Sequence, residues 1–355
     1  MTVPPNVSLC IVNYNGADRL AVVFRAIERQ SWPFAEVLMV DNASGDASVE
    51  TARELDAGVR VLRLPGNHGP GAARNAGFAA ASHDLIVFQD NDVQLGADTV
   101  AHLVAHLDAH PEALAVAPRV LYASAPETIQ YDSADCHFLG LMATRHADAP
   151  LRESDCGPSE TTSIVTACFL INRKIWRGTA PFDESFGFNL EDHDFGVRAR
   201  LAGHSLWIEP KARVRHGSGT PGLSYRPGRT PSEQRLFHLT LNRWKVVSRC
   251  YSLRTLFLLA PALLVFEITQ LAWLASQGHL RTWWRALSAF ARQRRALCAQ
   301  RRSIQRERRI RDLELLREAP LPLTRYLREQ RLAAIVVPGL DLSLRAYGRL
   351  VRRWL

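Results

Sequence analysis

Four apolar runs alternate with three helical patterns over the first part of the chain. The helical patterns occupy residues 17–30, 46–56 and 71–82. The apolar runs between them are VSLCIVN (7–13), VLMVDN (37–42), VRVLRL (59–64) and DLIVFQD (84–90). Strands and helices that alternate at this spacing are typical of βαβ units. The sequence therefore predicts an α/β fold with a mainly parallel sheet.

Each apolar run is followed by a polar or glycine-rich segment. These segments are NYNG (13–16), DNASGD (41–46), PGNHGPG (65–71) and DND (90–92). In open sheets of parallel strands, ligands bind beyond the carboxyl ends of the strands. We therefore expect the four segments to form one ligand-binding edge of the sheet.

Asp90 and Asp92 come directly after a buried-strand pattern. Aspartates commonly end strands in turns, because their side chains hydrogen-bond nearby backbone groups. A short acidic loop also supplies the oxygen ligands that Mg²⁺ and Mn²⁺ prefer, with substrate phosphates completing the coordination. These residues alone leave both interpretations open.

Three acids, Glu191, Asp192 and Asp194, stand just ahead of another helical pattern. Carboxylates are favoured at the positive end of a helix dipole, so one or two of them suit helix capping. The surplus indicates a catalytic base. Further along, His216 follows a short strand pattern. A lone histidine is more often structural, but near a metal its neutral ring becomes a candidate ligand.

The segment NHGPGAARNAGF (67–78) is a glycine-rich turn that opens a helix, where phosphate can bind. It lacks the third glycine of the dinucleotide-binding pattern and follows the third strand rather than the first. The pattern GxxxxGK[ST] is absent from the sequence. Dehydrogenases and P-loop hydrolases are therefore disfavoured.

Six segments, taken in order, resemble those of the family-2 inverting glycosyltransferases, which have the GT-A fold. They are VSLCIVNYNG, VLMVDNASGD, NHGPGAARNAGF, FQDNDV, TACFLINRKIW and FDESFGFNLEDHDFGVRARLAGH. The resemblance is strong over residues 5–220 and is greatest to bacterial rhamnosyltransferase-like enzymes of surface-polysaccharide assembly. It implies transfer of a sugar, with L-rhamnose as a candidate, from a dTDP- or UDP-sugar to a lipid-linked or saccharide acceptor.

The resemblance also implies roles for single residues. The nucleotide-sugar site would comprise Asn13, Tyr14, Asp41, Asn67, Gly69, Arg74, Asp90 and Glu191. Within that site, Asp41 would contact the base and Asp90 would reach the ribose or the metal shell. Asp92 and His216 would bind Mg²⁺ or Mn²⁺, and Asp192 would be the catalytic base.

This assignment agrees with the chemistry of sugar transfer. A divalent cation stabilises the departing diphosphate, and a carboxylate on the opposite face of the sugar takes the proton of the attacking hydroxyl. Single displacement with inversion then needs one essential carboxylate besides the metal ligands.

Three other classes of protein fit the sequence less well. Processive synthases of the family carry QxxRW, whereas the nearest stretch here is TLNRW (240–244), which favours addition of one or a few sugars. A sugar nucleotidyltransferase would need an activating lysine in the first strand–helix loop, and NYNGADR (13–19) has none. A catalytically silent GT-A domain that serves as a scaffold is the alternative, although the joint presence of the four residues Asp41, Asp92, Asp192 and His216 argues against it.

Net charge divides the chain into two parts. Residues 1–234 carry 20 Lys and Arg against 28 Asp and Glu, whereas residues 235–355 carry 24 against 7. Glycine and proline cluster between residues 217 and 231, so we expect a catalytic domain at 1–230 and an Arg-rich helical region at 231–355.

The second region contains the most apolar stretch of the chain, residues 253–276. Pro261 and Glu267 interrupt it, and the uninterrupted run 256–266 is shorter than the roughly 20 residues that span a bilayer. An ordinary core helix is one interpretation of this stretch, and a helix lying on a membrane is the other. With Arg-rich, Trp-containing flanks, the stretch resembles a helix on an anionic membrane more than a nucleic-acid-binding segment, since no nucleic-acid motif is present. We therefore expect a cytoplasmic protein bound peripherally to the inner membrane.

Overall fold

The computed structural model describes residues 5–151, 157–176, 178, 180–217, 231–322 and 331–355, and the chain divides into two compact units. Unit 1 comprises Met1–Ala134, Thr144–Phe195 and His204–Pro221. Unit 2 comprises Asp135–Ala143, Gly196–Gly203 and Gly222–Leu355. The sequence stretch predicted as a domain boundary falls mostly on residues 218–230, which lie outside the described residues.

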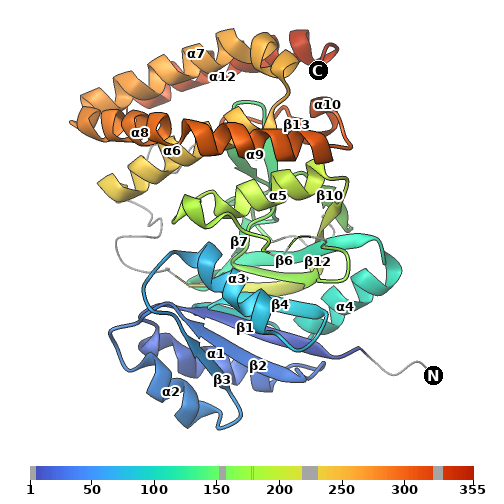
Figure 1. Cartoon of the computed structure of the whole chain (residues 1–355). Coiled ribbons are helices and arrows are strands. Elements are labelled where there is room, and N and C mark those ends of the chain that lie inside the picture. The colour runs from blue at the N-terminus through green and yellow to red at the C-terminus, as the bar shows by residue number, and fades with distance from the viewer. Residues whose placement is uncertain (1–4, 152–156, 177, 179, 218–230, 323–330) are drawn as a thin grey trace. The chain divides into compact units, whose positions relative to one another are not determined.

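Unit 1 is built on a mixed sheet with the strand order β10-β12-β6-β11-β4-β1-β2-β3 (Figure 1). Its strands are β1 Val7–Asn13, β2 Glu36–Asp41, β3 Arg60–Arg63, β4 Leu85–Asp90, β5 Val93–Leu95, β6 Ala113–Tyr122, β7 Ala125–Tyr131, β10 Ser159–Thr161, β11 Cys168–Asn172 and β12 Ser205–His216. The helices along this part of the chain are α1 Ala17–Glu28, α2 Ser48–Leu55, α3 Pro70–Ala80, α4 Thr99–Ala109, the short 3-10 helix η1 Glu184–Phe186 and α5 Glu191–Leu201.

The predicted α/β fold with a mainly parallel sheet is confirmed. Strands β1 to β4 pair in parallel, as do β6 and β12, whereas β11 runs antiparallel to both β4 and β6. The four predicted strands and three predicted helices of the first part form with ends shifted by at most two residues. Every residue of β1 is buried, because a central strand of such a sheet is covered on both faces.

Unit 2 is mainly helical. Its helices are α6 Glu233–Cys250, α7 Leu253–Ser276, α8 Leu280–Arg292, α9 Arg294–Glu307, α10 Asp312–Leu315 and α12 Arg331–Arg352. A small sheet accompanies them, formed by β8 Ala134–His137, β9 Met142–Thr144 and β13 Leu316–Arg317. Helix α6 packs on α8 and α9, and α7 packs on α8 and α12 (Figure 1).

Helix α7 is continuous from Leu253 to Ser276 and contains Pro261 within it. By length and composition α7 is long and apolar enough to cross a membrane, and no other helix of the described residues meets that description.

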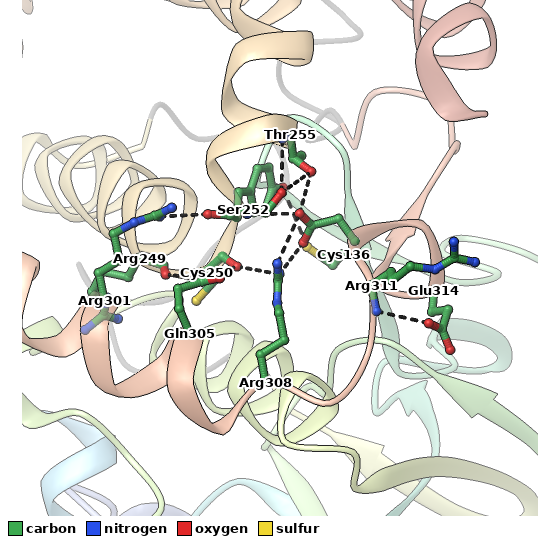
Figure 2. A network of polar contacts seen from close by, with 12 residues as sticks. Cys136, Arg249, Cys250, Ser252, Thr255, Arg301, Gln305, Arg308, Arg311 and Glu314 are labelled. Carbon is green, nitrogen blue, oxygen red and sulfur yellow. Dashed lines mark hydrogen bonds and ion pairs between the residues drawn. The ribbon is translucent and has the colours of Figure 1, made fainter. Parts of the chain in front are cut away.

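A buried polar network fixes the corner between α6 and α7 (Figure 2). The Asp312 carboxylate accepts hydrogen bonds from the Ser252 backbone N–H at 2.9 Å and from the Thr255 hydroxyl, and it forms an ion pair with Arg308. Gln305 donates from Nε2 to the Cys250 carbonyl at 3.0 Å. Because Ser252 caps α7, this network sets the position at which α7 begins.

Candidate active site

The carboxyl ends of three neighbouring strands carry the first group of predicted residues. Asn13 ends β1, Asp41 ends β2 and Asp90 ends β4. In the sheet register Asn13 lies opposite Asp41, and Val12 lies opposite Asp90. Parallel pairing therefore places these side chains at one edge of the sheet, as the polar segments of the sequence predict.

Asp41 is fully buried and organises this edge. Its Oδ1 accepts from Asn13 Nδ2 at 2.9 Å, and its Oδ2 accepts from the Ser44 backbone N–H at 3.1 Å. Arg63 lies 3.6 Å from the same carboxylate. The side chain holds β1 and the loop after β2 together, and a contact of Asp41 with a nucleotide base stays a prediction.

Asn91 completes the same cluster and is a residue that sequence reasoning missed. It is buried, and its Nδ2 donates to Asn13 Oδ1 at 2.7 Å and to the Tyr14 carbonyl at 3.3 Å. Asn91 therefore links the acidic loop after β4 to the loop after β1. The signal was its position between Asp90 and Asp92 in a loop of this edge.

The glycine-rich turn before α3 is held by Asn42, a second residue that sequence reasoning missed. Asn42 Nδ2 donates to Asn67 Oδ1 at 2.9 Å and to the Gly69 carbonyl at 3.0 Å. Gly69 has φ +89°, and a Cβ there would lie 1.7 Å from the Gly187 carbonyl oxygen. Only glycine fits this position, because both the left-handed backbone and the close approach exclude a side chain.

Arg74, on α3, joins two of the predicted acids. Its guanidinium donates to Asp90 Oδ1 at 2.6 Å and to the Thr166 carbonyl at 3.0 Å, and it lies 3.4 Å from Glu191 Oε1. The Arg74 side chain is 2% exposed, that of Glu191 7% and that of Asp90 30%. Arg74 Nε and Glu191 Oε2 have no hydrogen-bond partner among the described residues, so the group offers unused polar atoms to a ligand.

Asp192 and Glu191 stand at the first turn of α5, as the sequence predicts. Asn189 and Leu190 before them have φ values of 63° and 64°, so two successive left-handed residues lead into the helix. Asp192 Oδ1 accepts from the His193 backbone N–H at 2.8 Å. Burial raises the pKa of Asp192 to about 6. Burial and the neighbouring Asp192 raise the pKa of Glu191 to about 8, against the effect of Arg74.

Asp92 and His216 lie together, although 124 positions separate them in the sequence. His216 Nε2 is 3.3 Å from Asp92 Oδ1, and His216 Nδ1 is 3.0 Å from Gln130 Oε1. Because the amide oxygen of Gln130 only accepts, Nδ1 carries the proton and Nε2 faces the carboxylate. Burial lowers the pKa of His216, but the hydrogen bond that the protonated ring donates to Asp92 and the negative charges of Asp92 and Asp90 outweigh it, and the net shift is upward.

Asp92 and His216 are candidate ligands of a divalent cation. Among the described residues, no group of three or more His, Cys, Asp or Glu side chains is placed to hold a metal ion. Mg²⁺ and related ions in phosphate-handling sites are commonly held by only one or two protein ligands, with substrate phosphates and waters supplying the rest. An imidazole nitrogen facing a buried carboxylate, beside unused polar atoms at Arg74, therefore fits a cation shared with a diphosphate.

Residues 8–178, which contain most of this site, match the family model described as glycosyl transferase family 2. This segment, just under half of the chain, is similar to family 2 glycosyltransferases. Asp192 and His216 lie beyond the matched segment, so their inclusion in the site rests on the structure.

Relatives of the family 2 domain are distant. The pre-mycofactocin glycosyltransferase of Mycobacterium tuberculosis is 29% identical over 59% of this chain and 41% of its own length. The N-acetylglucosaminyl-diphospho-decaprenol L-rhamnosyltransferase of the same organism is 26% identical over 57% of this chain and 71% of its own length. The chain thus spans less than half of the length of the first of these relatives.

The fold of the domain is also that of a solved glycosyltransferase. The crystal structure of GalNAc-T7 with UDP, GalNAc and Mn²⁺ superposes with a TM-score of 0.54, at 18% identity over 69% of this chain and 48% of that chain. The predicted GT-A fold is therefore confirmed, and at this identity the likeness shows the fold alone.

Proposed function

We propose that the protein is a metal-dependent inverting glycosyltransferase that moves a sugar from a nucleotide-diphosphate donor to a lipid-linked or saccharide acceptor. The observation that carries the proposal is the convergence of Asp92, His216, Arg74 and Asp192 at one edge of a GT-A sheet. The M. tuberculosis rhamnosyltransferase makes L-rhamnose a candidate sugar and a lipid-linked diphosphate a candidate acceptor. The name of another relative, the succinoglycan biosynthesis protein ExoO of Rhizobium meliloti, makes polysaccharide biosynthesis a candidate role for the transfer.

Different residues of the donor half of the site have different roles. Asp92 and His216 hold Mg²⁺ or Mn²⁺, which stabilises the negative charge of the departing diphosphate. Arg74, fixed by Asp90 and Glu191, supplies a further positive charge near the phosphates. The loop of Asn67 and Gly69 brings the N-terminus of α3 toward the nucleotide.

The acceptor half depends on Asp192. As an ionised carboxylate, it takes the proton of the attacking hydroxyl while that oxygen bonds to the anomeric carbon and the diphosphate leaves. One displacement inverts the anomeric configuration. Glu191, with its raised pKa, is largely protonated near pH 7 and therefore leaves Asp192 as the base.

Calorimetry of donor binding tests the proposal. dTDP-rhamnose, UDP-sugars and GDP-mannose are titrated into the protein with Mg²⁺, with Mn²⁺ and without metal, and again into Asp92→Ala. Asp18→Ala is the matched control, because that aspartate is 82% exposed on α1. We expect metal-dependent binding of one donor that is lost only in Asp92→Ala.

Absence of binding with either metal to folded protein would refute the proposal. Metal-dependent binding without transfer to any acceptor, and without effect of Asp192→Asn on donor hydrolysis, would instead favour a GT-A scaffold that has no catalytic activity.

A further inference from the structure

Helix α7 presents an apolar stripe to solvent. Leu253, Phe257, Leu264 and Ile268 are 74%, 81%, 61% and 58% exposed, and their spacing places them on one face of the helix. Further exposed apolar positions along the helix are Ala260, Pro261, Val265, Ala272 and Ala275, and Arg254 and Ser276 near its two ends are exposed as well. A core helix of this composition would be buried, so the exposed stripe requires an explanation.

Polar contacts hold α7 against the other helices of unit 2. The Glu267 carboxylate accepts from Trp244 Nε1 at 3.0 Å and from Trp283 Nε1 at 2.9 Å, and it forms an ion pair with Arg243. Tyr347 of α12 donates from its hydroxyl to the Leu258 carbonyl at 2.7 Å. Residues of α6, α8 and α12 thus hold α7 along its length, and the stripe is left outward.

The two helices packed against α7, which are α8 and α12, carry further exposed apolar side chains. On α8, Trp284 is 58% exposed; on α12, Leu342 and Leu350 are 59% and 57% exposed, and Trp354, just past the end of α12, is 40% exposed. Exposed arginines lie on α8 and α9, at Arg281, Arg285, Arg292, Arg294, Arg295, Arg302 and Arg306. Apolar and aromatic side chains beside arginines are the composition of a surface that binds an anionic lipid interface.

We propose that α7 lies in the plane of an anionic lipid bilayer, with its stripe inserted among the acyl chains and the arginines of α8 and α9 against the lipid headgroups. The inference stands on the surface of unit 2 and does not depend on the activity of unit 1. It assigns the basic, helical region of the chain a lipid partner.

The contacts of α7 oppose the orientation in which it crosses the bilayer. A spanning α7 would carry the buried ion pair of Glu267 and Arg243, together with the helices packed beside it, to the depth of the hydrocarbon. Charged groups at that depth are costly. In the plane of the membrane the same groups stay on the protein side, and only apolar side chains enter the lipid.

Charge disfavours two other occupants of the stripe. In a symmetric dimer that pairs this surface with itself, the arginines of α8 and α9 would approach their own copies. A nucleic acid would neutralise the arginines but would leave the apolar stripe in water. An anionic bilayer satisfies both components together.

Vesicle flotation of the full chain tests the proposal. The protein is mixed with phosphatidylcholine vesicles, with or without one quarter phosphatidylglycerol, at low and high salt. We expect binding to the anionic vesicles, weakened by salt as surface charges are screened. The variant Phe257→Glu/Ile268→Glu should lower the partition coefficient by at least about 100-fold, since each side chain loses its apolar burial.

Two matched variants separate the contribution of the apolar stripe from that of the arginines. Val22→Glu places the same charge on an apolar position of α1 that is 40% exposed, and it should bind as the parent chain does. Arg294→Gln/Arg295→Gln should weaken binding to anionic vesicles by about tenfold or more and leave binding to neutral vesicles unchanged. Circular dichroism and donor calorimetry on each variant show that the fold and the nucleotide site persist.

Several outcomes would overturn the proposal. These are failure to bind either vesicle, binding that Phe257→Glu/Ile268→Glu does not change, and a lipid-free dimer that this variant dissociates. Retention in vesicles after an alkaline carbonate wash would show that α7 spans the bilayer instead. Loss of vesicle binding with intact donor binding concerns this inference alone, whereas loss of donor binding with intact vesicle binding concerns the proposed activity alone.

Discussion

Two adjacent carboxylates at the start of α5 have environments that separate their protonation. Glu191 is 7% exposed with a pKa raised to about 8, and Asp192 has a pKa raised to about 6. Between these values one of the two is neutral and the other ionised. A pair of acids whose pKa values are pushed apart is a means of assigning roles, and here it assigns the base to Asp192.

Asp192→Asn should lower kcat by about 100- to 10,000-fold while donor affinity is retained, because the variant removes only the proton acceptor.

In the parent chain, kcat should fall about tenfold per pH unit below about pH 6, as Asp192 becomes protonated. Initial rates between pH 4.5 and 8 check both. Glu191→Gln imitates the protonated acid and should preserve the acidic limb. A loss smaller than tenfold in Asp192→Asn would assign the base elsewhere.

Arg74→Met should lower the free energy of unfolding by about 2 kcal/mol. The full cost of breaking a buried ion pair is about 3–5 kcal/mol, but Asp90 is 30% exposed and water will solvate part of its charge. Urea unfolding of the single variant and of Arg74→Met/Asp90→Asn measures this, and the second substitution should restore part of the loss. Equal destabilisation in both variants would show that packing, not charge, is lost.

At the level of secondary-structure elements, periodicity was sufficient to predict β1 to β4 and α1 to α3, because strands buried on both faces read as continuous apolar runs. The roles of Asn42 and Asn91 were not predictable, since an amide that bridges two loops leaves no periodic pattern.

The turn before α3 also depends on long-range contact. Gly69→Ala should reduce donor affinity by at least about tenfold and the free energy of unfolding by about 2 kcal/mol, because the new Cβ meets the Gly187 carbonyl and the left-handed backbone is strained. Calorimetry and urea unfolding measure the two effects. Gly45→Ala is the control, since nothing lies within 4 Å of a Cβ there. Unchanged affinity in Gly69→Ala would dissociate this turn from the nucleotide site.

At the scale of the whole molecule, charge and composition predict two regions along the chain, but they locate the boundary between the regions only approximately. Two short segments of unit 2, Asp135–Ala143 and Gly196–Gly203, come from within the stretch expected to be catalytic. No composition shift marks them, since their membership depends on packing. They pack with the second unit, so its stability depends on more than the Arg-rich region.

Asp312→Ala should therefore unfold unit 2 selectively. It removes the acceptor of Ser252 and Thr255 and leaves Arg308 without its carboxylate, which should cost about 2–3 kcal/mol. In this variant, hydrogen exchange should quicken in peptides from α7 to α9 and stay unchanged in peptides from β1 to β4. Addition of UDP with Mn²⁺ should slow exchange only in the peptides from β1 to β4, because the ligand stabilises the unit that binds it. Glu314→Ala removes an exposed acceptor on the same short helix and should alter neither unit. Equal quickening in both sets of peptides of Asp312→Ala would show instead that the two units unfold together. The chain crosses between the units at Asp135–Ala143 and Gly196–Gly203, and these segments would then couple the unfolding of one unit to that of the other.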